Sequence, residues 1–215
     1  MSAVEHPTDT GASEATVAPI LPLLLLESIR AHDRPREVLQ NEDLASSLPR
    51  RLGLTGVVES RIRRYEEEQR RGRGVPLDDV LDLIRLVLRR PDAELILRQT
   101  GEELARRHFK RISAATVSAL GFLPGTAGAA ALRRAVRSML RRATGASDLE
   151  VRGWPIQVRI RDSLTSQADP NGNACVLFAA ALEKLLELYT RKRPQIVHTA
   201  CNAWGDEACI WSWTE

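Results

Sequence analysis

Apolar residues recur at helical spacing through the first two thirds of the chain. The clearest amphipathic segment runs from 76 to 90, and its apolar face comprises Leu77, Val80, Leu81, Ile84, Val87 and Leu88. Pro76 at the start, Asp78 in the first turn and Arg90 at the end are typical of helix boundaries. This segment is therefore predicted to be a helix that buries one face in a core.

The same spacing predicts further helices over 19–32, 36–48, 92–110, 112–120 and 128–142. Asp92 is predicted to cap the helix that follows it. Gly101 interrupts that helix at a cost of about 1 kcal/mol relative to alanine, which suggests close packing against another element. The charged segment 61–73 fits either an exposed helix or a loop, and residues 122–126 fit a turn.

The period of the pattern changes after residue 145. Apolar and polar residues alternate over 149–154 and 156–160, which predicts two strands. A helix is predicted to begin near Cys175, with Asn171 or Asn173 as its cap. Two more strands are predicted to follow, over 195–201 and 207–213 on either side of Gly205. The expected fold is α+β: a helical N-terminal half, followed by a β-β-α-β-β unit with a roughly four-stranded antiparallel sheet.

The pattern also predicts the domain organisation. Residues 1–18 are small and polar and are expected to form a disordered tail. Residues 19–215 are expected to form one domain, with a helical part (19–145) and a part that holds the sheet and a metal site (146–215).

Composition narrows the function classes. Of 215 residues, 43% are hydrophobic and 4% aromatic, and the net charge is only +3. One predicted helix has a basic face, which comprises Arg133, Arg134, Arg137, Arg141 and Arg142. This face fits either a solvated surface or a contact with phosphate, and we expect no nucleic-acid partner. The longest apolar run, 20–26, is far shorter than the roughly 20 residues of a transmembrane helix. The acidic start lacks the positive charge of a signal peptide, so we expect a cytoplasmic protein.

Candidate metal chemistry lies near the end of the chain. All three cysteines fall there, with one of the four histidines. A hairpin about Gly205 would place Cys201 opposite Cys209, with Cβ atoms roughly 4.5–5.5 Å apart. That separation suits two thiolates on one zinc ion, and Cys175 and His198 would complete a Cys3His set. Four protein ligands leave no open position, so the predicted zinc is structural.

Two alternatives to the metal remain open from the residues alone. His198 and Cys201 would point to opposite faces of a regular strand, so both can bind only if the strand bulges or ends near Thr199. A Cys201–Cys209 disulfide competes, although a cytoplasmic location disfavours it. The third possibility is three buried thiols and a surface histidine without any ion.

Recognisable catalytic motifs are missing from the sequence. It contains no Gly-x-Gly-x-x-Gly after a strand, no phosphate-binding loop and no nucleophile elbow. His108 lies in an arginine-rich helix and is expected to be solvated. The sequence therefore shows no recognisable nicotinamide, flavin or nucleoside triphosphate site.

The spacing of Cys175, His198, Cys201 and Cys209 around the Gly205 turn resembles that of the vinyl-4-reductase domain family. In that family a cysteine opens the penultimate helix, a strand carries Glu-x-x-Cys, and a further cysteine follows a Gly-Asp turn. Vesicle-tethering subunits and aromatic-sensing bacterial activators share the fold, and the activators bind zinc at these positions. His198 stands where the family usually has glutamate, and histidine is an equally competent zinc ligand.

The resemblance extends over residues 20–213, most closely to the branch of the family that acts in bacteriochlorophyll biosynthesis. It implies a protein that binds or delivers a tetrapyrrole, such as divinyl chlorophyllide or its precursors, and that has a structural zinc. The family name implies reduction of a vinyl group, but no hydride-carrying cofactor motif is visible, so catalysis stays open.

The resemblance also suggests a ligand-contacting residue and alternative functions. Trp154 is a candidate for a hydrophobic pocket between the helices and the sheet, or else a core residue, while Trp211 and Trp213 are expected to serve as core or lid. One alternative function is a stand-alone sensor of a small hydrophobic or aromatic ligand. Another is a dimeric scaffold, because relatives with this fold form dimers.

Overall fold

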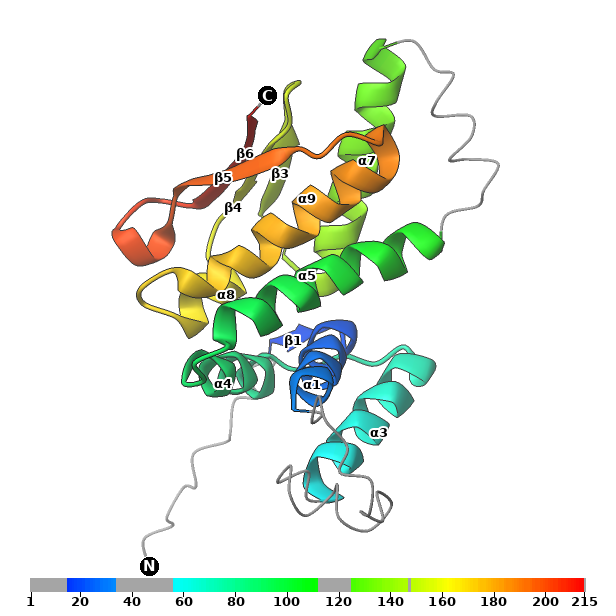
Figure 1. Cartoon of the computed structure of the whole chain (residues 1–215), viewed down its shortest axis with the longest axis vertical. Helices are drawn as coiled ribbons and strands as arrows, with labels where there is room; N and C mark the ends of the chain where they lie inside the picture. The colour runs from blue at the N-terminus through cyan, green and yellow to red at the C-terminus, as the bar shows by residue number, and fades with distance from the viewer. Residues whose placement is uncertain (1–14, 34–55, 112–124, 147, 215) are drawn as a thin grey trace, which may run out of the picture.

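Helices and a sheet occupy different parts of the chain in the computed structural model (Figure 1). The structure describes residues 15–33, 56–111, 125–146 and 148–214. Helices dominate the N-terminal half, and a four-stranded antiparallel sheet lies in the C-terminal part. The α+β fold class predicted from the sequence is confirmed.

The described helices follow the predicted apolar periodicity. They are α1 (Ile20–His32), α3 (Gly56–Arg71), α4 (Leu77–Leu88), α5 (Ala93–Lys110), α7 (Gly125–Thr144), α8 (Leu164–Ala168) and α9 (Val176–Thr190). The charged segment 61–73 is helical up to Arg71, because Ile62 and Tyr65 anchor it in the core. α7 begins at Gly125, within the predicted turn, and α8 lies between the predicted strand 156–160 and the helix predicted to begin near Cys175, where the sequence predicts no helix. The predicted helices 36–48 and 112–120 lie outside the described residues.

The sheet contains β3 (Leu149–Arg152), β4 (Gln157–Ile160), β5 (Gln195–Ala200) and β6 (Cys209–Thr214) in the spatial order β3-β4-β6-β5. The sheet has four strands and every neighbouring pair is antiparallel, so the predicted four-stranded antiparallel sheet is confirmed. β6 is inserted between β4 and β5, with Trp211 opposite Val158 on one side and His198 on the other. The last strand of the chain is therefore central in the sheet.

A short two-stranded pairing corrects the predicted disordered tail. β1 (Thr16–Val17) pairs antiparallel with β2 (Val75–Pro76), and Val17 is buried. The backbone N–H of Leu77 also donates to the carbonyl of Ala15, at 2.8 Å. The boundary at residue 18 is therefore wrong, because burial of Val17 orders the backbone before α1. Residues 1–14 lie outside the described residues.

Helix α9 lies between the sheet and α5 (Figure 1). Against the sheet, the rings of Phe178 and Trp211 pack edge to face with centroids 5.8 Å apart. Against α5, the approach is so close that a Cβ on Gly101 would lie 2.1 Å from the carbonyl oxygen of Leu177. The close packing predicted at Gly101 is confirmed, since only glycine leaves room there for the α9 backbone.

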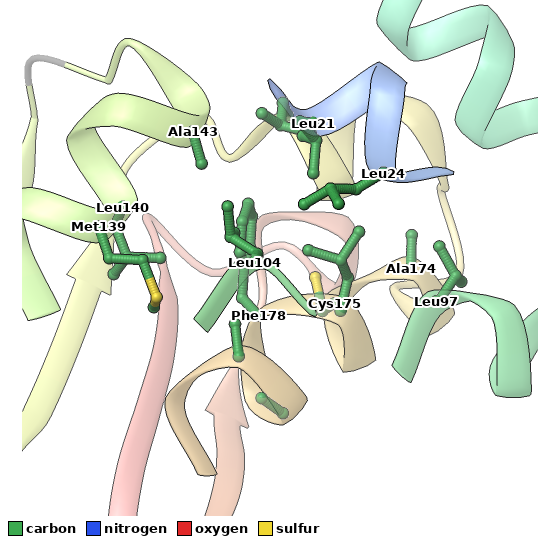
Figure 2. Close-up of a cluster of buried hydrophobic side chains, with 14 of the residues drawn as sticks. Leu21, Leu24, Leu97, Leu104, Met139, Leu140, Ala143, Ala174, Cys175 and Phe178 are labelled. Carbon is green, nitrogen blue, oxygen red and sulfur yellow. The ribbon is translucent and has the colours of Figure 1, made fainter. Parts of the chain in front are cut away.

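One cluster of buried apolar side chains joins the helices to the sheet. It includes residues of α1, α5, α7, α9 and all four strands of the sheet, and Figure 2 shows part of it, with Cys175 among the apolar side chains. Among the described residues, no helix combines the length and apolarity needed to cross a bilayer.

The predicted cap of α5 is wrong in its bonding. Asp92 occupies the N-cap position, but its side chain makes no capping bond. Its carboxylate instead accepts two hydrogen bonds from the Arg90 guanidinium, at 2.9 and 3.0 Å. Both partners of this pair are ionised and share two hydrogen bonds, an arrangement that is strong among charge-assisted hydrogen bonds.

Candidate metal centre

Cys175 lies where a short 3-10 helix, η1 (Asn173–Cys175), passes into α9. Its side chain is almost fully buried, and its sulfur contacts the Thr165 hydroxyl at 3.2 Å. The prediction that Asn171 or Asn173 caps the helix is wrong, because neither side chain makes a capping hydrogen bond. Asp169 instead accepts hydrogen bonds from the backbone N–H groups of Asn171 and Ala174, at 2.9 and 2.8 Å. The buried Asp169 carboxylate therefore holds the turn that presents the Cys175 sulfur.

Cys201 and Cys209 flank the connection between β5 and β6. A 3-10 turn, η2 (Asn202–Trp204), is followed by Gly205 with a φ of 96°, a conformation that favours glycine. The Asp206 carboxylate accepts from the backbone N–H of Cys201 at 2.8 Å, and the Asp206 N–H donates back to the Cys201 carbonyl at 3.1 Å. These bonds tighten the turn and bring the two sulfurs to 3.6 Å.

A β-bulge brings His198 to the same side as the cysteines. His198 pairs with Trp211, but Ala200 pairs with Ile210, so Thr199 is an extra residue in β5. This is the irregularity that the sequence required if His198 and Cys201 were to share a site, and it is confirmed. Nε2 of His198 is buried and has no hydrogen-bond partner among the described residues. A buried polar atom without a partner costs free energy, which a metal bond would recover.

The four ligand atoms have the spacing of a tetrahedral metal site. The ligand atoms of Cys175, His198, Cys201 and Cys209 all lie within 4.8 Å of one another. The Cys201 sulfur lies 3.8 Å from that of Cys175 and 3.6 Å from that of Cys209. Zn–S bonds of about 2.3 Å in a tetrahedron give sulfur separations of about 3.8 Å. The geometry thus fits one ion at the centre of the four side chains.

A disulfide does not describe these cysteines. All three are free, and the two sulfur–sulfur separations exceed the S–S bond length of about 2.05 Å by far. The alternative of three buried thiols without an ion stays open, but His198 is half-buried rather than exposed, and its Nε2 is buried.

Hydrogen bonding and burial shift the pKa values of the three thiols in different directions. A hydrogen bond with Cys175 lowers the pKa of Cys209, and the His198 ring lowers it further against the effect of burial. A hydrogen bond with Cys209 raises the pKa of Cys175, as does burial, and burial raises the pKa of Cys201. Cys209 is therefore the thiol of the cluster that ionises first as the pH rises. A divalent cation would supply the charge that lets the other two thiols ionise.

Two tryptophans enclose the imidazole. The Trp211 ring stacks on that of His198 with centroids 4.9 Å apart and planes at 17°, and the Trp204 ring lies 4.9 Å away on a tilted plane. Trp211 is buried and donates its indole N–H to the Cys175 carbonyl at 3.3 Å. Trp204 is 56% exposed and donates to the carbonyl of Asn171 at 3.1 Å. Trp211 therefore lies on the core side of the candidate metal centre, and Trp204 forms a cover over it on the solvent side.

Gly172 makes this cover possible. Its φ is 77°, and a Cβ at this position would lie 3.0 Å from Nε1 of Trp204 and 3.2 Å from the Cys201 sulfur. The loop before η1 thus passes directly beside both Trp204 and the Cys201 sulfur.

Trp154 does not join the metal centre. Its side chain is 51% exposed and packs edge to face against Trp213, with ring centroids 4.8 Å apart. Its alternative role as a core residue is therefore wrong, and its proposed contact with a ligand stays a prediction. Trp211 is fully buried, as was expected for a core residue.

Two supporting residues, Asp169 and Trp204, were missed in the sequence, and Asp206 was included only as part of the Gly-Asp turn. These three residues position or cover the candidate metal ligands, but none has a ligand-type spacing to the cysteines. The only available signal was position: Asp206 follows the turn glycine, and Asp169 precedes the loop that opens α9.

Four side chains thus converge on one point that can hold a metal ion: Cys175 from η1, His198 from β5, Cys201 directly after β5 and Cys209 from β6. Comparisons with protein-family models, with characterised proteins and with solved structures give no match to this chain.

Proposed function

We propose that Cys175, His198, Cys201 and Cys209 hold a zinc ion that has a structural role. The observation that carries this proposal is the buried, unpartnered Nε2 of His198 beside three sulfurs at tetrahedral spacing. Four protein ligands fill the coordination sphere of zinc, which is typical of a structural rather than a catalytic site. The ion would connect the start of α9 to the β5–β6 hairpin.

We propose further that the protein binds or delivers a tetrapyrrole of bacteriochlorophyll biosynthesis, such as divinyl chlorophyllide. The support is the ligand spacing, in which Cys175, His198, Cys201 and Cys209 follow the vinyl-4-reductase domain pattern around Gly205. The sequence also resembles the bacteriochlorophyll 4-vinyl reductase branch of that family. A binding role is favoured over reduction because the sequence carries no recognisable motif for a hydride-donating cofactor. The proposal includes a cytoplasmic location and a homodimer.

Metal analysis of the purified protein tests the zinc proposal. We expect about one zinc per chain, and the Cys201→Ser variant should lose the metal and unfold at a lower temperature, because metal binding and folding are coupled. Ser212→Ala is a matched control, since Ser212 lies on β6 but bonds the Gln157 side chain rather than the cluster. Wild-type protein without metal, with a melting temperature unchanged by Cys201→Ser, would refute the proposal; iron in place of zinc would refute only the identity of the ion.

Titration with chlorophyllide tests the functional proposal. We expect a saturable shift of the pigment's red absorption band at about one pigment per chain. No shift at excess pigment would count against tetrapyrrole binding and favour a sensor of another ligand or a scaffold. Reduction of the vinyl group with NADPH and this protein alone would replace the delivery role with catalysis.

A further inference from the structure

A second candidate site lies where α1, α3, α5 and α7 meet. A cavity of about 300 Å³ opens between these helices, and none of the four metal-site residues lines it. Ile20 from α1, Leu104 from α5 and Met139 from α7 give it an apolar lining. Figure 2 shows Leu104 and Met139 within the same buried cluster as Cys175. This volume is at the lower end of the roughly 300–1,000 Å³ of ligand pockets.

Positive charge surrounds the mouth of this cavity. Lys110 and Arg111 at the end of α5 and Arg142 near the end of α7 line it, and all three side chains are exposed. Arg107 also lines it, but its guanidinium already pairs with Glu27 and Glu103. No carboxylate belongs to the described lining of the cavity. Three positively charged side chains therefore line an apolar cavity, and the described lining of this cavity contains no acidic residue.

His108 supplies a polar group inside the cavity. It is only 9% exposed, which corrects the expectation that this histidine would be solvated. Burial lowers the pKa of His108, and the positive charges of Arg142 and Arg111 lower it further. The imidazole is therefore neutral near pH 7, and it can donate one hydrogen bond without adding a charge. Arg111 and Arg142 line the same cavity as His108.

We propose that this cavity binds a small molecule that has an apolar body and a single carboxylate. The apolar body would contact Ile20, Leu104 and Met139, and the carboxylate would lie between Arg111 and Arg142 within reach of His108. A free fatty acid or the propionate-bearing edge of a tetrapyrrole has this chemistry. The identification of the tetrapyrrole as one such ligand rests on the proposed function, whereas the binding of a carboxylate does not.

Calorimetric titration with dodecanoate and with dodecanol tests the charge requirement. The two probes have the same apolar chain, and only dodecanoate carries a charge at pH 8. We expect dodecanoate to bind with about tenfold higher affinity, because the contacts with Arg111 and Arg142 each contribute about two- to fivefold at a partly exposed site. Equal affinity for the two probes, or no binding of dodecanoate, would overturn the proposal.

Variants of the lining locate the probe. Arg111→Gln and Arg142→Gln should each weaken dodecanoate binding about two- to fivefold, and Ile20→Trp should abolish it, because the larger side chain would fill the cavity beside Ile20. Arg134→Gln is the matched control, because Arg134 is exposed on the same helix but does not line the cavity. Equal effects of Arg134→Gln and Arg142→Gln would contradict the assignment, and circular dichroism will confirm that each variant is folded.

Chlorophyllide and its methyl ester separate this proposal from the proposed function. If dodecanoate binds as expected and chlorophyllide does not bind, the tetrapyrrole role fails and the carboxylate site stands. If chlorophyllide binds equally well to wild type, Arg142→Gln and Ile20→Trp, the tetrapyrrole role stands and its placement in this cavity fails. Weaker binding of the ester and of both variants would support both.

Discussion

Gly101→Ala should destabilise the protein, although alanine is the better helix former. The added Cβ would lie 2.1 Å from the Leu177 carbonyl oxygen and 2.9 Å from the Ala181 nitrogen. Both are backbone atoms, so no side chain can rotate away. Helices α5 and α9 must instead separate by about 1 Å, which forfeits a large part of the dispersion energy across their contact.

The expected magnitude follows from two opposing effects. Overpacking typically costs about 1–3 kcal/mol, and an imposed backbone clash belongs at the upper end of this range. Exchanging a helical glycine for alanine recovers about 1 kcal/mol. The net loss is about 2 kcal/mol, which for a chain of this length lowers the melting temperature by about 4–8 °C.

Thermal and urea unfolding followed by circular dichroism will measure this loss. Gly72→Ala is the comparison, because a Cβ there meets no atom within 4 Å and only the positive φ of 67° opposes it. That backbone conformation costs a non-glycine residue about 1–2 kcal/mol. The sharper test is metal content, since a displaced α9 carries Cys175 with it and only Gly101→Ala should weaken metal retention. A neutral or stabilising Gly101→Ala would refute the close approach of the two helices.

Two further predictions concern the cover of the metal centre and the acid sensitivity of the fold. Trp204→Ala should speed metal removal by a chelator severalfold and barely change the melting temperature, because the exposed indole shields His198 and contributes little to the core; an unchanged removal rate would contradict the role as a cover. Arg90 donates hydrogen bonds to Asp33 and Asp92, and its guanidinium lowers the pKa of Asp92 in the folded protein. The stabilisation that this pairing gives to the fold is therefore fully present above the usual aspartate pKa of about 3.9. It is lost as the pH falls through the lower pKa that Asp92 has in the folded state. Arg90→Gln should therefore cost about 1 kcal/mol at pH 7 and progressively less as the pH falls below about 3.9, and a cost that is constant with pH in urea titrations would refute this origin.

Periodicity was sufficient to predict most elements of the described fold. The apolar face of 76–90 and the alternation in 149–160 are local patterns, so they appear in the sequence before any tertiary contact is known. The convergence of Cys201 and Cys209 was also predictable, because a hairpin about one glycine places its flanking residues opposite each other.

The remaining features depend on contacts that no local pattern carries. His108 is buried although it lies in an arginine-rich helix, and it lines a cavity together with residues of α1, α3 and α7. The capping role passes from Asn171 or Asn173 to Asp169 because the loop folds back through a positive φ at Gly172. The bulge at Thr199 was recognised only as a condition for metal binding, since β-bulges have no strong sequence signal.

The position of β6 between β4 and β5 has a consequence for how the chain folds as it emerges from the ribosome. β3 and β4 can pair as soon as both are made, but among the described strands β5 pairs only with β6. Until residues 209–214 have been synthesised, β5 and the sheet-facing side of α9 lack their main contact, and Cys209 is not yet available to a metal. Nascent chains halted before residue 209 should therefore remain open to proteases and chaperones, and closure of the sheet and capture of the ion should occur together.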